Sequence, residues 1–256
     1  MADSNTTIQG KKIFFLYPSA FVQNTIIEPL VQQEFEIYLV KDELKLQGIL
    51  RKYPDSIVFA CIDEVLSPDE WETWIRQVMG IKAAKDVKLG VLSNTNDDHS
   101  RELYLDTLKV PCGFIPVKLD KDKAIKTLLD TLAAVEAKGR RKYVRTNTRG
   151  DTLTTINLPI GDNYITGEIW DISVVGLSCT FPNETKLEKN AVFHNIQIKL
   201  HSMLLKVEGI VFGSRIEESE TVYVILFSSK TDATIKTKIR TFIQKRIQTQ
   251  MDEEMK

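Results

Sequence analysis

Hydrophobic residues in the first half of the chain fall into short continuous runs separated by longer amphipathic stretches. The runs are KIFFLYP (12–18), FEIYLVK (35–41), SIVFACID (56–63), VKLGVLSN (87–94) and CGFIPVK (112–118). Such near-continuous apolar runs are typical of strands buried on both faces of a parallel sheet. Five of these strands alternating with helices predict a doubly wound α/β domain over residues 1–138.

Two of the intervening stretches carry signals for helix ends. In SPDEWETWIRQVM, Ser67 can cap a helix, Pro68 suits its first position, and Glu70 completes a capping box. In KDKAIKTLLDTLAAVEAKG, apolar residues recur at helical spacing, and we expect Gly139 to end that helix.

The hydrophobic period changes after residue 139. The runs TLTTINLPI, YITGEIWDIS, GLSCTF, VFHNIQIKL, LLKVEGIVFG and TVYVILFS are rich in strand-forming residues and have no helix between them. They predict a six-stranded antiparallel β-barrel. The last segment, from residue 231, has an apolar face made of Ile235, Ile239, Phe242, Ile243 and Ile247, which predicts a helix docked on the barrel. The second domain therefore spans residues 139–256.

Composition narrows the possible functions. Of the 256 residues, 43% are hydrophobic and 27% are charged, with a formal net charge of −1, which is typical of an ordinary globular protein. Proteins that bind nucleic acids or membranes without specificity usually carry a broad basic field. Both functions are therefore less favoured for this chain. The N-terminus lacks the apolar core of a signal peptide, and no run is long enough to span a membrane. We expect Cys61, Cys112 and Cys179 to be buried free thiols in a cytoplasmic protein.

Positive charge is nevertheless concentrated at one point. GRRKYVRTNTR (139–149) contains four arginines and one lysine with no acid. Because it lies where the hydrophobic period changes, it is predicted to be an interdomain linker, and solvated charge alone could explain it. A second polar group, however, follows at a predicted strand-to-strand turn, where WDISVVGLS contains Asp171, Ser173 and Gly176.

Together these two stretches resemble the PilZ domain family, whose members bind the bacterial second messenger cyclic di-GMP. The family motifs RxxxR and [D/N]xSxxG correspond to residues 141–145 and 171–176, and the resemblance covers roughly residues 139–250. It implies that Arg141 and Arg145 contact phosphate and guanine, and that Asp171 and Ser173 form a second guanine-reading set. Arg140 occupies a position that in this family influences whether one ligand or an intercalated pair binds.

The residue types suit this ligand on chemical grounds as well. A guanidinium is planar and always charged, so it can pair in two-pronged fashion with a phosphate or with the O6/N7 edge of guanine. A carboxylate such as Asp171 accepts from the guanine N1 and N2 donors. Gly176 would permit a positive φ or a close approach of the ligand. We predict that Arg149 is solvated and that Trp170 is a core residue.

The first domain resembles a response-regulator receiver in the order of its elements. Asp63, Ser93 and Lys118 occupy plausible positions for the phosphorylated aspartate, the hydroxyl and the lysine of a receiver. The first strand ends in FLYPSA, however, and lacks the acidic pair that holds magnesium. We therefore predict a degenerate domain that is structural or binds a protein partner, with no metal and no cofactor. In NDDHS (96–100) the acids predict a helix cap rather than a metal site.

These observations predict a non-enzymatic cyclic di-GMP receptor. Binding would change the arrangement of the domains and so regulate an unknown protein partner through residues 1–138, with motility, attachment and virulence as outputs associated with the family. One alternative is a PilZ-like scaffold without ligand binding, and another, less favoured, is nucleic-acid binding through the basic linker. The sequence has no glycine-rich phosphate loop, nucleophile elbow or zinc-spaced cysteine set.

Overall fold

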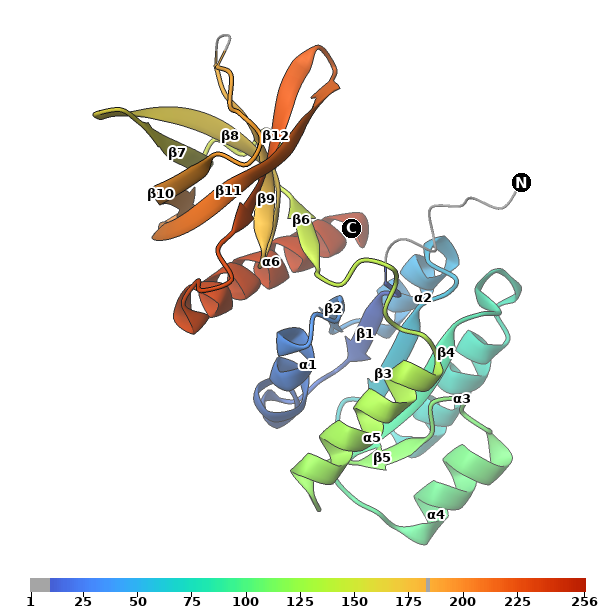
Figure 1. Ribbon diagram of the computed structural model, residues 1–256. Coiled ribbons are helices and arrows are strands. Elements are labelled where there is room, and N and C mark those ends of the chain that lie inside the picture. The colour runs from blue at the N-terminus through green and yellow to red at the C-terminus, as the bar shows by residue number, and fades with distance from the viewer. Residues whose placement is uncertain (1–9, 183–184) are drawn as a thin grey trace. The chain divides into compact units, whose positions relative to one another are not determined.

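The computed structural model describes residues 10–182 and 185–256, which divide into two compact units (Figure 1). The first unit contains the described residues up to Lys142 together with Ile247–Lys256, and the second is Tyr143–Arg246. Residues 1–9, where we predict no signal peptide, lie outside the described residues. The domain limits at 138 and 139 stay a prediction.

A parallel sheet forms the centre of the first unit. Its strands are β1 (Ile13–Leu16), β2 (Ile37–Val40), β3 (Ile57–Cys61), β4 (Lys88–Ser93) and β5 (Phe114–Pro116). Their order is β2-β1-β3-β4-β5, and all four neighbouring pairs run parallel. This is the doubly wound order of flavodoxin and CheY. The predicted receiver-like α/β class is confirmed.

Helical segments connect these strands. They are η1 (Val22–Ile27, a π-helix) continuing into α1 (Glu28–Gln32), α2 (Glu43–Lys52), α3 (Pro68–Met79), η2 (Lys82–Ala84, a 3-10 turn), α4 (Asp98–Arg101) continuing into η3 (Glu102–Thr107, a π-helix), and α5 (Lys121–Ala134). One face of the sheet packs against α1 and α5 in a core that includes Phe15, Leu30, Phe59, Ile115 and Leu128.

The predicted helix ends are partly right. At α3 the Ser67 side chain accepts from the Glu70 amide and the Glu70 carboxylate accepts from the Ser67 amide, so the capping box is confirmed. The end predicted for α5 is wrong, because the helix stops at Ala134 rather than at Gly139. Glu136, with φ 51°, takes the left-handed conformation that a glycine usually provides after a helix.

The second unit is a closed barrel. Its strands are β7 (Thr154–Ile160), β8 (Asn163–Ser173), β9 (Gly176–Thr180), β10 (Val192–Leu200), β11 (Met203–Glu217) and β12 (Glu220–Phe227). They pair antiparallel in the order β8-β7-β10-β11-β12-β9, and pairing between β8 and β9 closes the ring. The predicted six-stranded antiparallel barrel is confirmed.

A seventh strand lies in the segment predicted to be a linker. β6 (Arg145–Asn147) pairs antiparallel with the end of β8, so Arg145 opposes Ser173 and Asn147 opposes Asp171. The ladder continues at Thr148, whose amide donates to the Trp170 carbonyl at 2.8 Å. Arg145 is thus part of the sheet, and the segment predicted to be an interdomain linker contributes a strand to the second unit.

The final helix, α6 (Ala233–Glu254), presents the predicted apolar face. Ile239, Phe242, Ile243 and Ile247 are all buried. Within the second unit, Phe242 meets the ring of His201 edge to face at 5.4 Å between ring centroids. Helix residues up to Arg246 are therefore docked on the barrel, as predicted.

All three cysteines are buried and free, as predicted. Among the residues that the structure describes, no helix has both the length and the apolar character that crossing a bilayer requires.

Candidate ligand-binding site

The short strand β6 brings Arg145 beside Asp171. Arg145 Nη1 donates to Asp171 Oδ1 at 3.3 Å, and the two side chains are 47% and 28% exposed. Residues that oppose each other on antiparallel strands share a face of the sheet. Asn147, Asp171 and Ser178 therefore form one row across β6, β8 and β9.

Asp171 is oriented by a second contact that the sequence analysis missed. The Ser178 hydroxyl donates to Asp171 Oδ2, while Oδ1 meets Arg145. Partly exposed ion pairs contribute only about 0–1 kcal/mol to stability, so a ligand could displace Arg145 from this carboxylate at little cost. Ser178 could have been found from the sequence, because in a hairpin that turns at residues 174–175 it opposes Asp171.

Ser173 makes a local bond in this structure. Its side chain is buried, and its hydroxyl donates to the Gly176 carbonyl oxygen at 3.0 Å across the β8–β9 turn. This bond closes the hairpin and leaves the hydroxyl with little access to solvent. The guanine-reading role of Ser173 stays a prediction.

Gly176 is required by a neighbouring strand. It is not among the described glycines with positive φ, which are Gly113, Gly150 and Gly161. A Cβ at Gly176 would lie 2.5 Å from the carbonyl oxygen of Ile225 on β12. The prediction of a positive φ is therefore wrong, and the close approach that this glycine permits is between β9 and β12.

Arg140 and Arg141 belong to the first unit, whereas Arg145 belongs to the second. The division after Lys142 thus falls inside the RxxxR motif. Both Arg140 and Arg141 are exposed, and neither makes a hydrogen bond or ion pair with any residue the structure describes. The structure brings together Arg145, Asp171, Ser173 and Gly176, and leaves the contacts of Arg140 and Arg141 as predictions.

Arg149 is not simply solvated, contrary to the prediction. Its Cζ lies 3.8 Å from the centroid of the Trp170 ring, and its Nη2 donates to Glu218 Oε2 at 2.7 Å. The hydrogen bond raises the pKa of Arg149 and lowers the pKa of Glu218, so both groups stay charged. Trp170 is 5% exposed, which confirms that it is buried. The sequence signal was the alternation along 145–149, which places Arg149 on the same side as Arg145.

The carboxyl ends of the first unit's strands bring together two of the three receiver-like positions. Asp63 Oδ1 accepts from the Ser93 hydroxyl at 2.9 Å and from the Asn94 amide at 2.8 Å. Lys118 is exposed. After β1, the Tyr17 hydroxyl donates to the Glu43 carboxylate, and burial together with this neighbour raises the pKa of Tyr17 to about 12. Asp97 caps α4 by accepting from the Ser100 amide, as predicted.

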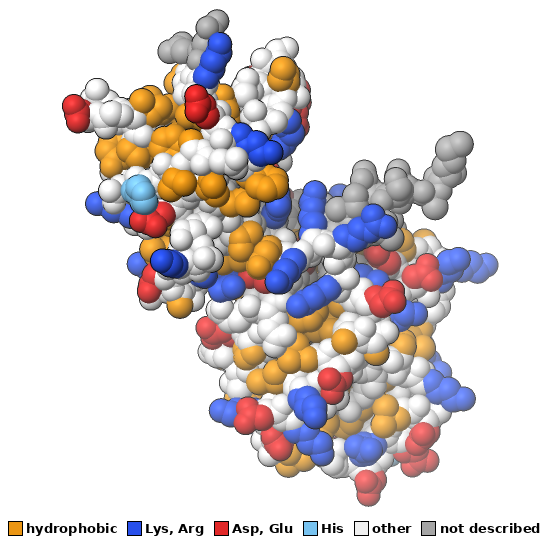
Figure 2. All heavy atoms as spheres, in the orientation of Figure 1, with side chains coloured by type: hydrophobic (Ala, Val, Ile, Leu, Met, Phe, Trp, Pro, Cys, Tyr) orange, Lys and Arg blue, Asp and Glu red, His pale blue; other side chains and the backbone are white. Residues whose placement is uncertain are grey.

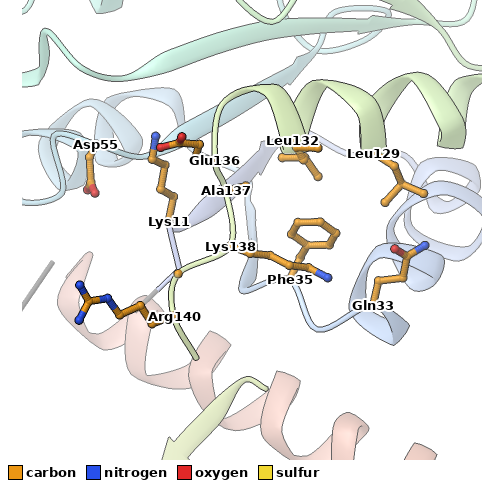
Figure 3. Close-up of a pocket in the computed structure, with 12 residues that line it drawn as sticks. Lys11, Gln33, Phe35, Asp55, Leu129, Leu132, Glu136, Ala137, Lys138 and Arg140 are labelled. Atoms are coloured by element: carbon orange, nitrogen blue, oxygen red, sulfur yellow. The ribbon is translucent and has the colours of Figure 1, made fainter. Parts of the chain in front are cut away.

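The first unit and the barrel each carry one other candidate surface. A cavity of about 840 Å³ in the first unit has an apolar floor that includes Phe35 and Leu132 (Figure 3). Its cations do not converge, because Lys138 lies 4.7 Å over the Phe35 ring and Lys11 donates to the Val135 carbonyl. Arg140 and Lys138 point to opposite sides in Figure 3. The cavity is therefore a poorer anion site than the Arg145–Asp171 pair.

The second surface lies on the barrel, where apolar side chains are exposed on the face shown in Figure 2. The exposed large apolar residues of the barrel include Val192, Leu204, Phe212 and Ile216, each more than half exposed. An exposed apolar surface fits a protein partner better than a dianionic ligand.

Solved structures similar to the chain include PilZ-domain proteins and CheY receiver proteins. The PilZ domain of YcgR from Escherichia coli with c-di-GMP is 13% identical, with a TM-score of 0.39, over 46% of this chain and 98% of that one. MotI/DgrA of Bacillus subtilis, an inhibitor of motility, is 16% identical with a TM-score of 0.37, over 43% of this chain and 52% of that one. CheY4 of Vibrio cholerae is 13% identical with a TM-score of 0.40, over 49% of this chain and 98% of that one.

No family model and no curated protein sequence matches the chain. The match to MotI/DgrA spans about half the length of that protein. At these TM-scores the likenesses do not decide the fold, which rests on the strand order and registers described above.

Proposed function

We propose that the chain is a non-enzymatic receptor for cyclic di-GMP, with its ligand on the outward face of β6, β8 and β9. The observation that supports this most directly is the exposed pair of Arg145 and Asp171 on adjacent strands. A permanent cation and an oriented carboxylate acceptor stand side by side there. Cyclic di-GMP offers the complementary groups, two phosphodiester anions and two guanines.

The ion pair between Arg145 and Asp171 is weak enough for the ligand to replace it with contacts to each residue. Arg145 leaves the weak ion pair for a phosphate or for the guanine O6/N7 edge, where its fork makes two hydrogen bonds. The released Asp171 oxygen then accepts from guanine N1 and N2, while Ser178 keeps the carboxylate in place. Both charges of the pair find new partners, so neither is left uncompensated.

Arg141 offers a route from binding to regulation. It lies in the first unit and Arg145 in the second. A ligand held by both arginines restrains the intervening residues 142–144, and the arrangement of the domains 1–138 and 139–256 changes if the ligand prefers one arrangement. Residues 1–138 then bind the protein partner, and the family resemblance points to motility, attachment or virulence as the output. Arg140, beside Arg141, sets whether one or two ligands bind.

Calorimetric titration of the full chain with cyclic di-GMP tests the proposal. We expect binding by the wild type and at least a tenfold loss in Arg145→Ala. Asp171→Asn should lose about tenfold against cyclic di-GMP, since a well-formed contact to a base edge contributes about 1–3 kcal/mol of discrimination. Against cyclic di-AMP, which lacks the N1–H and N2 donors of guanine, Asp171→Asn should change little.

Arg215→Ala is the matched control. Arg215 is 48% exposed and is paired with Glu217 at 2.8 Å on β11, a strand that pairs with β10 and β12 and not with β6, β8 or β9. Its loss should leave affinity within twofold. A wild type that gives no heat with cyclic di-GMP refutes the proposal and favours the scaffold alternative. Binding of generic DNA that falls steeply with salt would favour the nucleic-acid alternative.

A further inference from the structure

The stack of Arg149 on Trp170 has the form of a binding surface for a flat ring. The guanidinium carbon lies 3.8 Å from the indole centroid, so the indole covers one face of the guanidinium. The Arg149 side chain is still 36% exposed. The side chain is therefore accessible to a further planar group as well as to solvent. Guanidinium planes stack well on aromatic rings and on nucleobases.

The Arg149 side chain is held by Trp170 and Glu218, and hydrogen bonds fix the backbone around it. Its Nη2 donates to Glu218 at 2.7 Å, and its amide donates to Asn147 Oδ1 at 2.9 Å. The next amide, of Gly150, donates to Glu168 Oε1 at 2.6 Å. A long side chain fixed before the ligand arrives loses less conformational freedom on binding. The stack is therefore preorganised.

The hairpin tip that carries Glu218 is itself unusual. Glu218 and Ser219 both have left-handed φ, 51° and 71°, at the turn between β11 and β12. Two-residue hairpin turns of this kind usually carry Asn-Gly or Asp-Gly, so two consecutive side chains here are strained. The strained tip places the Glu218 carboxylate within reach of Arg149.

The buried indole of Trp170 also suggests a role beyond filling the core. Its indole N–H is buried and has no hydrogen-bond partner among the described residues. A buried donor without a partner is unfavourable, and a phenylalanine would fill the core without this cost. The larger indole plane, in contrast, is the best aromatic platform for a guanidinium.

The stack adjoins the candidate site. Trp170 precedes Asp171, and Arg149 lies two residues beyond Asn147, which opposes Asp171. Two residues of strand span about 7 Å. A ligand with two bases that engages Arg145 and Asp171 with one base can therefore bring the other toward Arg149.

We propose that Arg149 and Trp170 form a stacking platform for a purine base of the ligand, with Glu218 as the residue that positions Arg149. This inference rests on the proposed cyclic dinucleotide receptor function. The platform recognises the face of a base rather than its edge. It therefore adds affinity for any purine cyclic dinucleotide, whereas Asp171 selects guanine.

The test compares Arg149→Lys, which keeps the charge and loses the plane, with Arg215→Ala as the control on the same barrel. In calorimetric titrations of the full chain, Arg149→Lys should bind both cyclic di-GMP and cyclic di-AMP about tenfold more weakly. Arg215→Ala should bind within twofold of wild type. Glu218→Gln, which keeps Arg149 and Trp170 but weakens the contact that positions the guanidinium, should lose threefold or more against both ligands.

A direct signal comes from ¹⁹F NMR of protein labelled with 5-fluorotryptophan. Ligand should shift the Trp170 resonance, assigned by its absence in Trp170→Phe, and Arg149→Lys should reduce this shift. If the wild type binds neither dinucleotide, the proposed function fails and the platform with it. If the wild type binds and Arg149→Lys binds equally well with the same Trp170 shift, the platform alone is refuted.

Discussion

The glycine of the DxSxxG motif can be tested apart from any ligand by replacing Gly176 with alanine. An added Cβ would lie 2.5 Å from the Ile225 carbonyl oxygen and 3.1 Å from Leu226 Cα. Both are backbone atoms of β12, whose Leu226 pairs directly with Gly176. They cannot rotate away as the end of a side chain could, so β9 and β12 must separate.

The size of the effect follows from that displacement. Ordinary carbon contacts begin at about 3.4 Å, so the strands must move apart by roughly 1 Å. Overpacking of this kind typically costs 1–3 kcal/mol, and we expect about 3 kcal/mol here because the clash is with backbone. Gly213→Ala is the control. Gly213 pairs with Val224 on the same strand β12, but a Cβ there meets nothing within 4 Å. Its substitution should change stability by less than about 0.5 kcal/mol.

Urea unfolding measures the difference, provided that the two units are followed separately. Trp170 is in the second unit and Trp71 and Trp74 are in the first, so ¹⁹F NMR with 5-fluorotryptophan distinguishes their transitions. The Trp170 midpoint should fall by about 1–2 M in Gly176→Ala and stay unchanged in Gly213→Ala. Equal midpoints in the two variants would refute the packing role and return Gly176 to a role in ligand contact.

Three further predictions concern stability and reactivity. Ser67→Ala removes the capping box of α3 and should cost the first unit about 1 kcal/mol, read from the Trp71 and Trp74 transitions; no change would mean that the cap is dispensable. Burial alone raises the pKa of Asp151, but hydrogen bonds from His201, the Leu153 amide and Thr154 outweigh it, so the folded-state pKa is lowered. Its stabilisation is therefore present above the ordinary carboxyl pKa of 3.8 and lost as pH falls through the lowered value. Asp151→Asn should cost the barrel about 2 kcal/mol at pH 7 and approach the wild type in acid, and a difference independent of pH would contradict this. Burial raises the pKa of Cys112 to about 11 and raises those of Cys61 and Cys179 further, so no thiol should react with a disulfide reagent at pH 8 until urea unfolds the protein.

Much of the fold could be predicted because its elements bury their own apolar side chains. The runs of the parallel sheet are apolar on both faces, and residues along β7 alternate between buried and more exposed positions as a half-buried strand requires. The helix face from Ile239 to Ile247 follows the same logic. In each case the spacing of apolar residues within the segment shows which of its faces are buried.

Other features of the fold depend on contacts between residues far apart in the sequence, which the local spacing of apolar residues does not predict. β6 has the sequence RTN and is a strand only because the end of β8 leaves an edge for it. After α5 stops at Ala134, Glu136 rather than a glycine takes the left-handed conformation. Lys11 Nζ and the Lys11 amide hold the carbonyls of Val135 and Ala137 on either side of it. The partners of Arg149 lie 21 and 69 residues further along the chain, at Trp170 and Glu218.

Some residues of the candidate site stabilise the barrel, whereas Arg145 contributes little to its stability. Ser173 closes the β8–β9 turn and Gly176 admits β12, so two of the three DxSxxG residues have tasks in the barrel itself. A chain could therefore keep both without binding any ligand. Arg145 is different, because its side chain is 47% exposed and its ion pair contributes little to stability. The stability of the barrel therefore gives little reason for an arginine at that position, whereas the proposed anionic ligand would give one. Arg145 is accordingly the residue on which the proposed receptor function depends most directly.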